Sequence, residues 1–387
     1  MKIAFFDLTI NGIGRYPSRL SHIISNSDDD HEFIFYCDST EFGNEKIALK
    51  TLPQNSRVKL IGSPTAKNIL GLLKADQPDC LVVMAQRIPD SAIVIAANSL
   101  GIKTIMYQHG LYIPFMKREA KIFIERIGKT VRYLRYSMAI GKITDQGRFK
   151  TLLNYINVFV KGKPAADAFE NLRLLNADEV LVYGDHWKEY HTEHFGYSID
   201  QQITVGYPDL EGISKLQNKK PEKALCYIAQ TLIEDGRMDR QIMVSFIESL
   251  SSIVRRHNIS LIIKLHPRSD LSLYESLQGY ATFEQQDFPV CDTYIGHYSS
   301  VIIKGAFISN KLILVDFPEH EIPEYINELK SATSFYSDAA TLEKVITEEF
   351  YHDIDPEKIA KNLDYIKYYF DHSIEKPLTT AAYILLG

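Results

Sequence analysis

The feature that most constrains this chain is an alternation of short apolar runs with longer amphipathic stretches, which continues through most of its 387 residues. The apolar runs are rich in β-branched and aromatic side chains and are bounded by turn-forming residues, which predicts buried strands. An order of this kind predicts parallel, doubly wound α/β sheets. The expected strands cover residues 2–8, 31–37, 57–62, 79–84, 103–107, 177–184, 203–208, 223–229, 260–265, 292–295 and 311–316. The expected helices cover residues 65–75, 91–100, 239–257, 299–309, 341–350, 355–371 and 376–386.

A stretch rich in turn-forming residues divides this alternating pattern near the middle of the chain. Pro208, Gly212 and Pro221 lie close together there, among several lysines. Such a polar segment is typical of a linker, and the chain is long enough to form two hydrophobic cores. We therefore expect two Rossmann-like domains, residues 1–215 and 216–387, with a ligand cleft between them.

Three polar stretches follow expected strands of the second half. They are Glu234-Asp235-Gly236, Lys264-Leu265-His266-Pro267 and His297-Tyr298-Ser299-Ser300. The carboxyl ends of parallel strands meet at one edge of a sheet, and the ligands of open α/β sheets bind at that edge. We therefore expect the three stretches to converge on one substrate.

The acidic stretch offers a general base. Two neighbouring carboxylates repel each other, so the charge of Glu234 raises the proton affinity of Asp235, as suits a base that takes a proton from a hydroxyl. Gly236 permits an unusual backbone turn beside them. We predict that Asp235 is the base and that Glu234 contacts the substrate. The alternative is an acidic turn that caps the following helix.

The second stretch offers a partner for a phosphate. His266 directly follows an expected strand, and the fixed φ of Pro267 stiffens its turn. Its imidazole can donate a proton or a hydrogen bond to a departing phosphate oxygen. Lys264 and Arg268 add positive charge that suits a phosphate. The alternative is a histidine that packs at a strand end.

Two hydroxyls and two further histidines also lie at expected strand ends. Ser299 and Ser300 stand at the expected start of a helix, where hydroxyls and backbone N–H groups bind anions, although serine is also a common N-cap. His297 opens this stretch, and His109 follows the expected strand 103–107. Both histidines are candidate substrate contacts, and a structural turn residue is the alternative for His109.

Positive charge is concentrated in one segment of the first half. Residues 116–163 hold twelve Lys/Arg and three Asp/Glu, although the whole chain has a net charge of −6. Apolar residues alternate with the basic ones, a pattern typical of segments that lie on anionic membranes, where each basic residue contributes about 1 kcal/mol. A helix pair with a solvated charged face and the rim of a cleft for an anionic substrate are the alternatives.

The rest of the sequence predicts a cytoplasmic protein that is soluble or peripheral at the inner face of the membrane. No window approaches the roughly 18 apolar residues of a membrane span, and the amino terminus has no secretory signal pattern. The four cysteines form no CxxC pair and lie in or beside apolar runs, so we expect buried reduced thiols. No spacing typical of metal ligands is present, so we expect no metal or cofactor.

In their order, the three stretches resemble the motifs of bacterial sialyltransferases of the lipooligosaccharide type, glycosyltransferase family 52. They resemble more distantly those of bacterial polysialyltransferases. These families share an acidic pair followed by glycine, a His-Pro pair and a serine motif, matched here by Glu234-Asp235-Gly236, His266-Pro267 and Ser299-Ser300. Two similar α/β domains resemble the GT-B architecture of glycosyltransferases.

This resemblance implies transfer, with inversion, of sialic acid from CMP-sialic acid to a sugar hydroxyl of a surface glycan such as lipooligosaccharide or capsule. Asp235 is then the base and His266 the acid. The first domain binds the glycan acceptor and the second the nucleotide-sugar donor, with no further cofactor and no nucleic acid. A homodimer is compatible with the sequence. The residues assigned to the donor are Gly236, Lys264, Pro267, Arg268, Ser299 and Ser300.

Three alternatives stay open. The donor can be another CMP-nonulosonic acid or CMP-Kdo, because nothing in the motifs reads the substituents of the sugar. A CDP-glycerol-type polyol phosphotransferase also suits a basic membrane-facing segment and a His-Pro turn. The third alternative is a non-enzymatic glycan-binding or assembly protein with a degenerate transferase fold.

Overall fold

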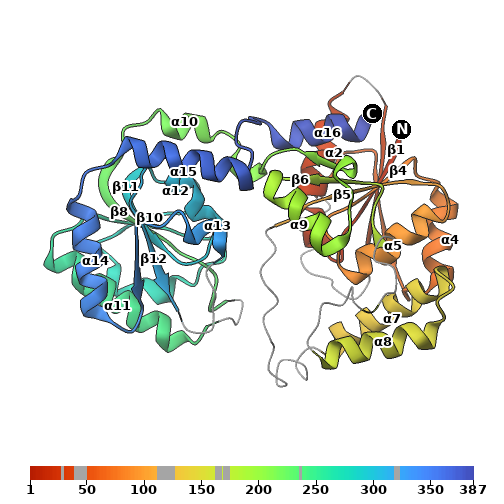
Figure 1. Ribbon diagram of the computed structural model, residues 1–387, viewed down its shortest axis with the longest axis horizontal. Helices are drawn as coiled ribbons and strands as arrows, with labels where there is room; N and C mark the ends of the chain where they lie inside the picture. Colours follow the sequence, from red (N-terminus) through yellow and green to blue (C-terminus); the bar gives the residue numbers. More distant parts are fainter. Residues whose placement is uncertain are drawn as a thin grey trace. The chain divides into compact units, whose positions relative to one another are not determined.

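The computed structural model describes residues 1–27, 30–38, 50–110, 127–161, 168, 175–234, 238–317 and 323–387, without the side chains of 127–130 and 159. The chain divides into two compact units, Met1–Pro208 with Lys376–Gly387, and Asp209–Glu375. Each unit is built on one parallel sheet (Figure 1). The expected α/β class with two parallel-sheet domains is therefore confirmed.

The first unit holds a seven-stranded sheet in the order β3-β2-β1-β4-β5-β6-β7, and all neighbouring strands are parallel. The chain builds outward from β1 to β3, returns to β4 beside β1, and then builds outward in the other direction. Inner strands such as β4 are buried along their whole length, as is typical of a sheet covered on both faces. The strands are β1 Lys2–Phe6, β2 Glu32–Asp38, β3 Ser56–Ile61, β4 Cys80–Val83, β5 Lys103–Tyr107, β6 Glu179–Val182 and β7 Gln202–Thr204.

Helices cover both faces of this sheet. Right-handed crossovers that leave β1 and β4 in opposite directions place α2 and α5 on opposite faces. Helices α4, α5 and α7 pack on one another, and α8 packs on α7. The helices are α1 Ile10–Ile13, α2 Tyr16–Ser25, α4 Ala66–Asp76, α5 Ile88–Asn98, α7 Ile127–Ile143, α8 Arg148–Val160, α9 Asp185–Phe195 and α16 Pro377–Leu386.

The last helix changes the expected division of the chain. The sequence assigns 376–386 to the second domain, but α16 packs against α2 and belongs to the first unit (Figure 1). The first crossing between the units falls at Pro208, earlier than the expected 215. The apolar face of α16 explains the return, because Leu378, Ala381 and Leu385 are buried there.

The second unit holds a six-stranded parallel sheet in the order β10-β9-β8-β11-β12-β13. The strands are β8 Glu222–Ile228, β9 Leu261–Lys264, β10 Thr282–Glu284, β11 Cys291–Gly296, β12 Leu312–Asp316 and β13 Ala332–Phe335. The expected strands of this half are confirmed. The sequence did not indicate the edge strands β10 and β13, because they are short and only partly buried.

The core of the second unit lies between its sheet and the helices α11 and α14. Phe246 and Leu250 of α11 and Leu342 of α14 pack against Ile263 and Ile313 of the sheet. Helices α12 and α15 pack together elsewhere in the unit. The helices are α10 Ile213–Gln217, α11 Arg240–Arg256, the 3-10 segments η5 Leu271–Leu277 and η6 Ser300–Ile302, α12 Ile303–Ala306, α13 Glu324–Asn327, α14 Ala339–Tyr351 and α15 Pro356–Tyr369.

Two further expectations concern the whole chain. All four cysteines are buried and form no disulfide. In the part of the chain that the structure describes, no helix is long and apolar enough to cross a membrane.

Gly305 allows α12 to lie close to the sheet. A Cβ at this position would lie 2.8 Å from the ring of Tyr294 and 3.1 Å from Leu312 Cδ2. Both neighbours are buried, so Gly305→Ala should lower the free energy of unfolding by about 1–3 kcal/mol. Gly71→Ala is the control, because a Cβ there meets nothing within 4 Å, and it should be neutral or stabilising by about 0.5–1 kcal/mol. Urea unfolding followed by circular dichroism measures both, and equal stability of the two variants would contradict this packing.

Candidate active site

The strand order of the second unit reverses between β8 and β11. Connections leave these strands in opposite directions, and the crevice that this creates at their carboxyl ends is where open α/β sheets bind ligands. Glu234 follows β8, residues 297–300 follow β11, and His266 follows β9 on the other side of β8. Strands lie about 4.8 Å apart, so the three strand ends lie within about 10 Å of one another. The described parts of the three predicted stretches thus share one edge of one sheet.

His266 lies in a tight turn whose hydrogen bonds orient its ring. The backbone N–H of His266 donates to Ser269 Oγ at 3.0 Å, and the N–H of Ser269 donates to the carbonyl of His266 at 2.9 Å. Nδ1 accepts a hydrogen bond from the backbone N–H of Arg268 at 3.1 Å. A ring nitrogen that accepts carries no proton, so the neutral imidazole carries its proton on Nε2. The side chain is exposed at this edge of the sheet.

Glu234 links the acidic stretch to the His-Pro turn. Its Oε1 accepts a hydrogen bond from the backbone N–H of Asp270 at 2.6 Å, and its Oε2 is buried. A second link joins the same two loops, because the guanidinium of Arg268 donates to Thr231 Oγ1 at 3.2 Å. Glu234 therefore has an anchoring role that the sequence does not indicate. Asp235 and Gly236 of this stretch lie outside the described residues, so the placement of the base stays a prediction.

His297 is enclosed in the core of the second unit. It is 0% exposed, its Nε2 lies 3.0 Å from the hydroxyl of Tyr227, and the ring of Phe317 lies 4.3 Å away between centroids. Burial raises the pKa of Tyr227 far above its ordinary value, so the phenol stays protonated. This burial and the contact with Tyr227 indicate that His297 fastens the loop after β11 to β8. Its substrate contact stays a prediction.

The two serines stand at the start of a short helical segment. Ser299 is the N-cap of η6, and its Oγ accepts from the backbone N–H of Val301 at 3.2 Å. The expected helix 299–309 is shorter than predicted, since η6 passes into α12, which ends at Ala306. The N-cap alternative therefore holds for Ser299, whose hydroxyl proton remains available to a ligand oxygen. The assignment of Ser299 and Ser300 to the donor stays a prediction.

Two lysines add positive charge near these loops. Lys264 ends β9 and donates to the backbone carbonyl of Gln285 at 2.6 Å, and burial lowers its pKa. Burial also lowers the pKa of Lys304 in α12, against the opposing charge of Asp209, and the charge of Lys264 lowers it further. A bound anion would relieve this mutual repulsion. The sequence did not single out Lys304, although its position one helical turn after Ser300 would have placed both side chains on one face.

The first unit has its own reversal of strand order, between β1 and β4, and a charged cluster lies there. Arg87 after β4 donates from Nε and Nη2 to Asp90 at 2.6 and 2.9 Å, and its Nη2 lies 3.6 Å from Asp7, which follows β1. Burial raises the pKa of Asp90, and the charge of Arg87 opposes that rise. Gly12 approaches Asp7 so closely that a Cβ would lie 2.4 Å from its carboxylate. The sequence did not indicate this cluster, because its members are far apart in the chain.

His109 lies at the same carboxyl edge of the first sheet, after β5. It is partly buried, and its ring meets the ring of Tyr16 edge-on with 5.0 Å between centroids. The next residue, Gly110, donates its backbone N–H to the hydroxyl of Tyr183 at 3.2 Å. The structure thus confirms a strand-end position for His109, and its substrate contact stays a prediction.

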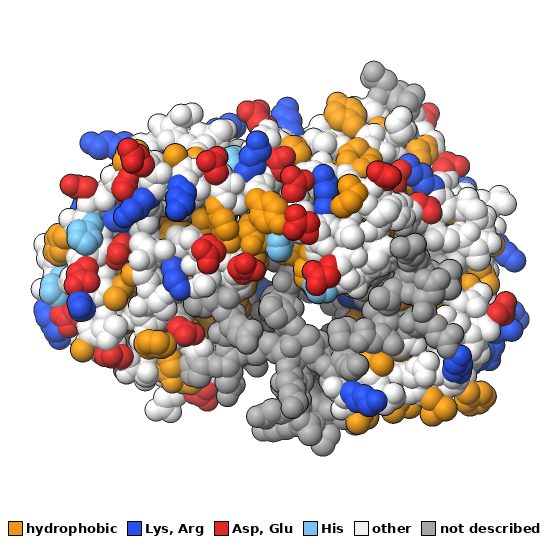
Figure 2. Space-filling view, viewed as in Figure 1, with side chains coloured by type: hydrophobic (Ala, Val, Ile, Leu, Met, Phe, Trp, Pro, Cys, Tyr) orange, Lys and Arg blue, Asp and Glu red, His pale blue; other side chains and the backbone are white. Residues whose placement is uncertain are grey.

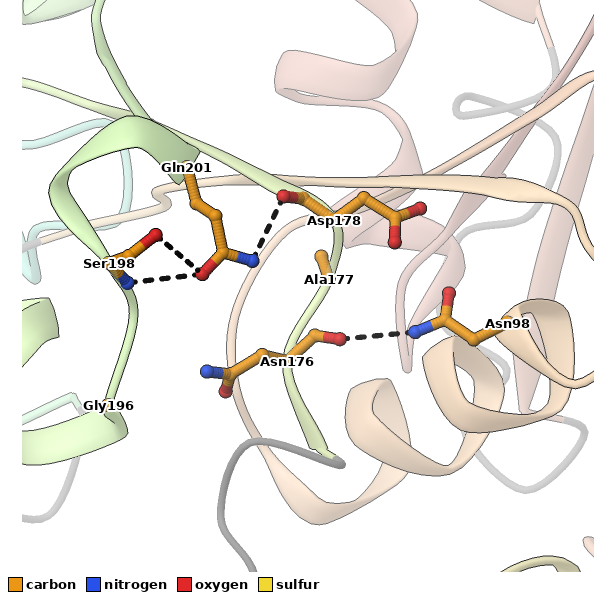
Figure 3. A pocket seen from close by; sticks show the side chains of 7 residues that line it. All are labelled: Asn98, Asn176, Ala177, Asp178, Gly196, Ser198 and Gln201. Atoms are coloured by element: carbon orange, nitrogen blue, oxygen red, sulfur yellow. Dashed lines mark hydrogen bonds between the residues drawn. The ribbon is translucent and has the colours of Figure 1, made fainter.

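Two cavities lined by described residues lie away from these strand ends. One of about 320 Å³ lies at the amino ends of β5 and β6, where Asn98 donates to the carbonyl of Asn176 at 3.2 Å beside Asp178 (Figure 3). The other, of about 720 Å³, is lined by Lys311 and Ser331 at the amino ends of β12 and β13. Among the described residues, no group of three or more His, Cys, Asp or Glu is placed to hold a metal ion. The strand-end chemistry of the second unit therefore marks the candidate site.

The fold is the one shared by GT-B glycosyltransferases and UDP-GlcNAc 2-epimerases. UDP-GlcNAc 2-epimerase from Neisseria meningitidis superimposes with a TM-score of 0.55 at 10% identity, with 100% of both chains covered. The calicheamicin glycosyltransferase CalG4 gives 0.54 at 12% identity, covering 100% of this chain and 97% of that one. A UDP-glucosyltransferase from Polygonum tinctorium gives 0.52 at 12% identity, covering 100% and 99%. At such identities the likeness establishes the fold, and the expected GT-B class is confirmed.

A sequence profile of the alpha-2,8-polysialyltransferase family (POLYST) matches residues 40–289, more than half of the chain. No curated protein sequence matches significantly. The chain therefore belongs to the alpha-2,8-polysialyltransferase family and is a glycosyltransferase of the sialyltransferase-like kind. The matched range contains the acidic and His-Pro stretches and ends before the serine pair. The more distant of the two resemblances is thus confirmed, and the resemblance to family 52 stays a prediction.

Glu234 accepts a hydrogen bond from the backbone N–H of Asp270. We predict that the rate of sugar transfer depends more on this hydrogen bond than on the negative charge of Glu234. Glu234→Gln keeps an oxygen for the N–H of Asp270 and should retain the rate of sugar transfer within about twofold. Glu234→Ala leaves that N–H without its partner, which costs about 1–3 kcal/mol if it stays buried, and should slow transfer about tenfold by loosening the loop. Initial rates of nucleotide release measure both variants. If both variants lost activity to the same extent, the reaction would instead require the negative charge of Glu234.

Proposed function

We propose that the protein transfers sialic acid from CMP-sialic acid, with inversion, to a hydroxyl of a bacterial surface glycan such as a capsule or lipooligosaccharide. Membership of the family supports the transferred sugar. The observation that carries the assignment of the site is the meeting of the loops of Glu234, His266 and Ser299 at the reversal of strand order in the second unit. In this proposal the second unit binds the donor and the first unit binds the acceptor.

The reaction exchanges one bond at the anomeric carbon. Asp235 takes the proton of the acceptor hydroxyl, whose oxygen forms the new bond to this carbon. The bond from the carbon to the phosphate oxygen breaks, and its electron pair leaves with CMP. The anomeric carbon of sialic acid bears a carboxylate and no hydrogen, so the transition state has strong oxocarbenium character. The enzyme must mainly position the acceptor and stabilise the departing phosphate.

His266 supports the departing phosphate as a neutral hydrogen-bond donor. Its Nδ1 is occupied by the N–H of Arg268, which would face a second proton if the ring became an imidazolium. The Nε2–H therefore donates to a phosphate oxygen without full transfer of a proton, a refinement of the acid role that the resemblance implies. The hydroxyls of Ser299 and Ser300 and the amine of Lys264 complete the proposed phosphate site.

The substitution His266→Asn tests hydrogen-bond donation by Nε2 without disrupting the fold of the turn. The amide oxygen of an asparagine can still accept from the N–H two residues later and keep the turn, but the side chain has no donor at the position of Nε2. We expect kcat to fall by about 10²–10³, the usual cost of removing one hydrogen-bond donor to developing negative charge, while Tm stays within a degree or two of the unsubstituted protein. A near-normal rate of CMP release in His266→Asn would remove this side chain from the mechanism.

The pH profile of the same reaction tests the protonation state. A histidine that worked as an imidazolium would lose activity as the pH rises from about 6 to about 8, whereas a neutral donor keeps it. We therefore expect kcat to hold level or rise over this range. A fall in kcat over this range that is absent in His266→Asn would show instead that His266 acts as an imidazolium.

A donor screen tests the function itself. The protein is given CMP-sialic acid, CMP-Kdo or CDP-glycerol with an oligosaccharide acceptor, and nucleotide release and product mass are measured. We expect turnover with CMP-sialic acid that Asp235→Asn lowers by about 10²–10⁴. Turnover only with another CMP-sugar or with CDP-glycerol would replace the proposed donor, and binding of glycan without turnover of any donor would favour a glycan-binding protein.

A further inference from the structure

Helix α8 carries an exposed apolar stripe. Its four members recur every three or four residues, a spacing that places them on one face of a helix. They are Phe149, Leu153, Ile156 and Val160, which are 77%, 65%, 43% and 77% exposed. We call these four residues the α8 stripe.

The opposite face of α8 already has a partner. Thr151, Tyr155 and Val158 are buried, and α8 packs against α7 along the hairpin that the two helices form. The α8 stripe therefore lies on the face of the helix that is turned away from α7, and it is not part of the core. Single exposed apolar residues are ordinary, but a continuous row on one helix is typical of a binding surface.

Basic residues border the α8 stripe. Arg148, Lys150 and Lys161 are exposed on α8 and at its end, and Arg135 and Lys142 are exposed on α7. Residues 127–161 contain seven Lys/Arg and a single acidic residue. Figure 2 shows hydrophobic and basic side chains together along the outer edge of this hairpin. The occupant of the surface must therefore be apolar and anionic at once.

We propose that the α8 stripe docks on the surface of an anionic lipid bilayer. Apolar side chains of an interfacial helix enter the boundary between headgroups and acyl chains, while basic residues beside them contact anionic headgroups. α8 has 13 residues, and no helix in the described ranges can cross a membrane, so the helix lies in the plane of the surface. The sequence predicts membrane binding for the whole segment 116–163, and this proposal assigns the binding to one face of α8. It does not depend on which sugar is transferred.

A second copy of the chain fits this surface less well. Dimers with two-fold symmetry bring the same patch of both copies together. Such a contact would place the basic borders of two stripes against each other, and like charges facing across an interface are unfavourable. An anionic bilayer satisfies the apolar row and the basic border together.

The first test changes the apolar row in the full-length protein. Flotation with vesicles of phosphatidylcholine and phosphatidylglycerol should recover the unsubstituted protein, and Phe149→Ser/Leu153→Ser/Val160→Ser should bind at least tenfold less. The matched control is Ile199→Ser/Leu271→Ser/Phe335→Ser, since these side chains are 58%, 58% and 55% exposed on other elements. The control should bind normally, and Tm should confirm that both variants fold. Equal binding by the stripe variant and the unsubstituted protein would overturn the proposal.

The second test changes the charge. Arg148→Gln/Lys161→Gln should weaken binding to the anionic vesicles several-fold, whereas the exposed pair Lys219→Gln/Lys220→Gln should not. Vesicles of phosphatidylcholine alone should bind poorly, and added salt should weaken binding to the mixed vesicles. Binding that ignores both lipid charge and salt would overturn the proposal. So would an oligomer in sedimentation that dissociates in the stripe variant without any vesicle binding, because it would assign the surface to a second copy.

Discussion

The candidate site depends on one constraint, the parallel pairing of β8 with strands on both of its sides. Parallel strands all end at the same edge of the sheet, so every loop that follows a strand begins there. The chain leaves β8 toward β9 and β10 and later returns to β11 on the other side. This reversal opens the edge between β8 and β11. Residues more than sixty positions apart thereby become neighbours without any motif that links them directly.

Hydrogen bonds between these loops then determine what each side chain can do. The backbone N–H of Asp270 donates to Glu234, and the guanidinium of Arg268 donates to Thr231. The hydroxyl of Tyr227 lies within hydrogen-bond distance of His297. Such bonds fix the groups before a ligand arrives, which reduces the reorganisation needed during a reaction. They also divide the polar residues of the motifs into those that hold the loops and those that can face a ligand.

The first unit uses the same type of sheet with an additional surface. Its reversal of strand order carries the charged cluster of Asp7, Arg87 and Asp90, and its helical hairpin carries the α8 stripe. The two features lie on different elements and have different chemistry. One is a set of charges at a strand edge whose two carboxylates are buried, and the other is an exposed amphipathic face.

The sequence by itself determined the class of fold, most strands and the three motif stretches, because apolar periodicity and strand-end residues are local signals. It did not indicate that α16 returns to the first unit, that His297 is buried, or that Nδ1 of His266 accepts from Arg268. Each of these depends on which segments pack together or on how one turn closes, and periodicity contains no such information. The tertiary structure decided them through burial and hydrogen bonds, most of which join residues far apart in the chain.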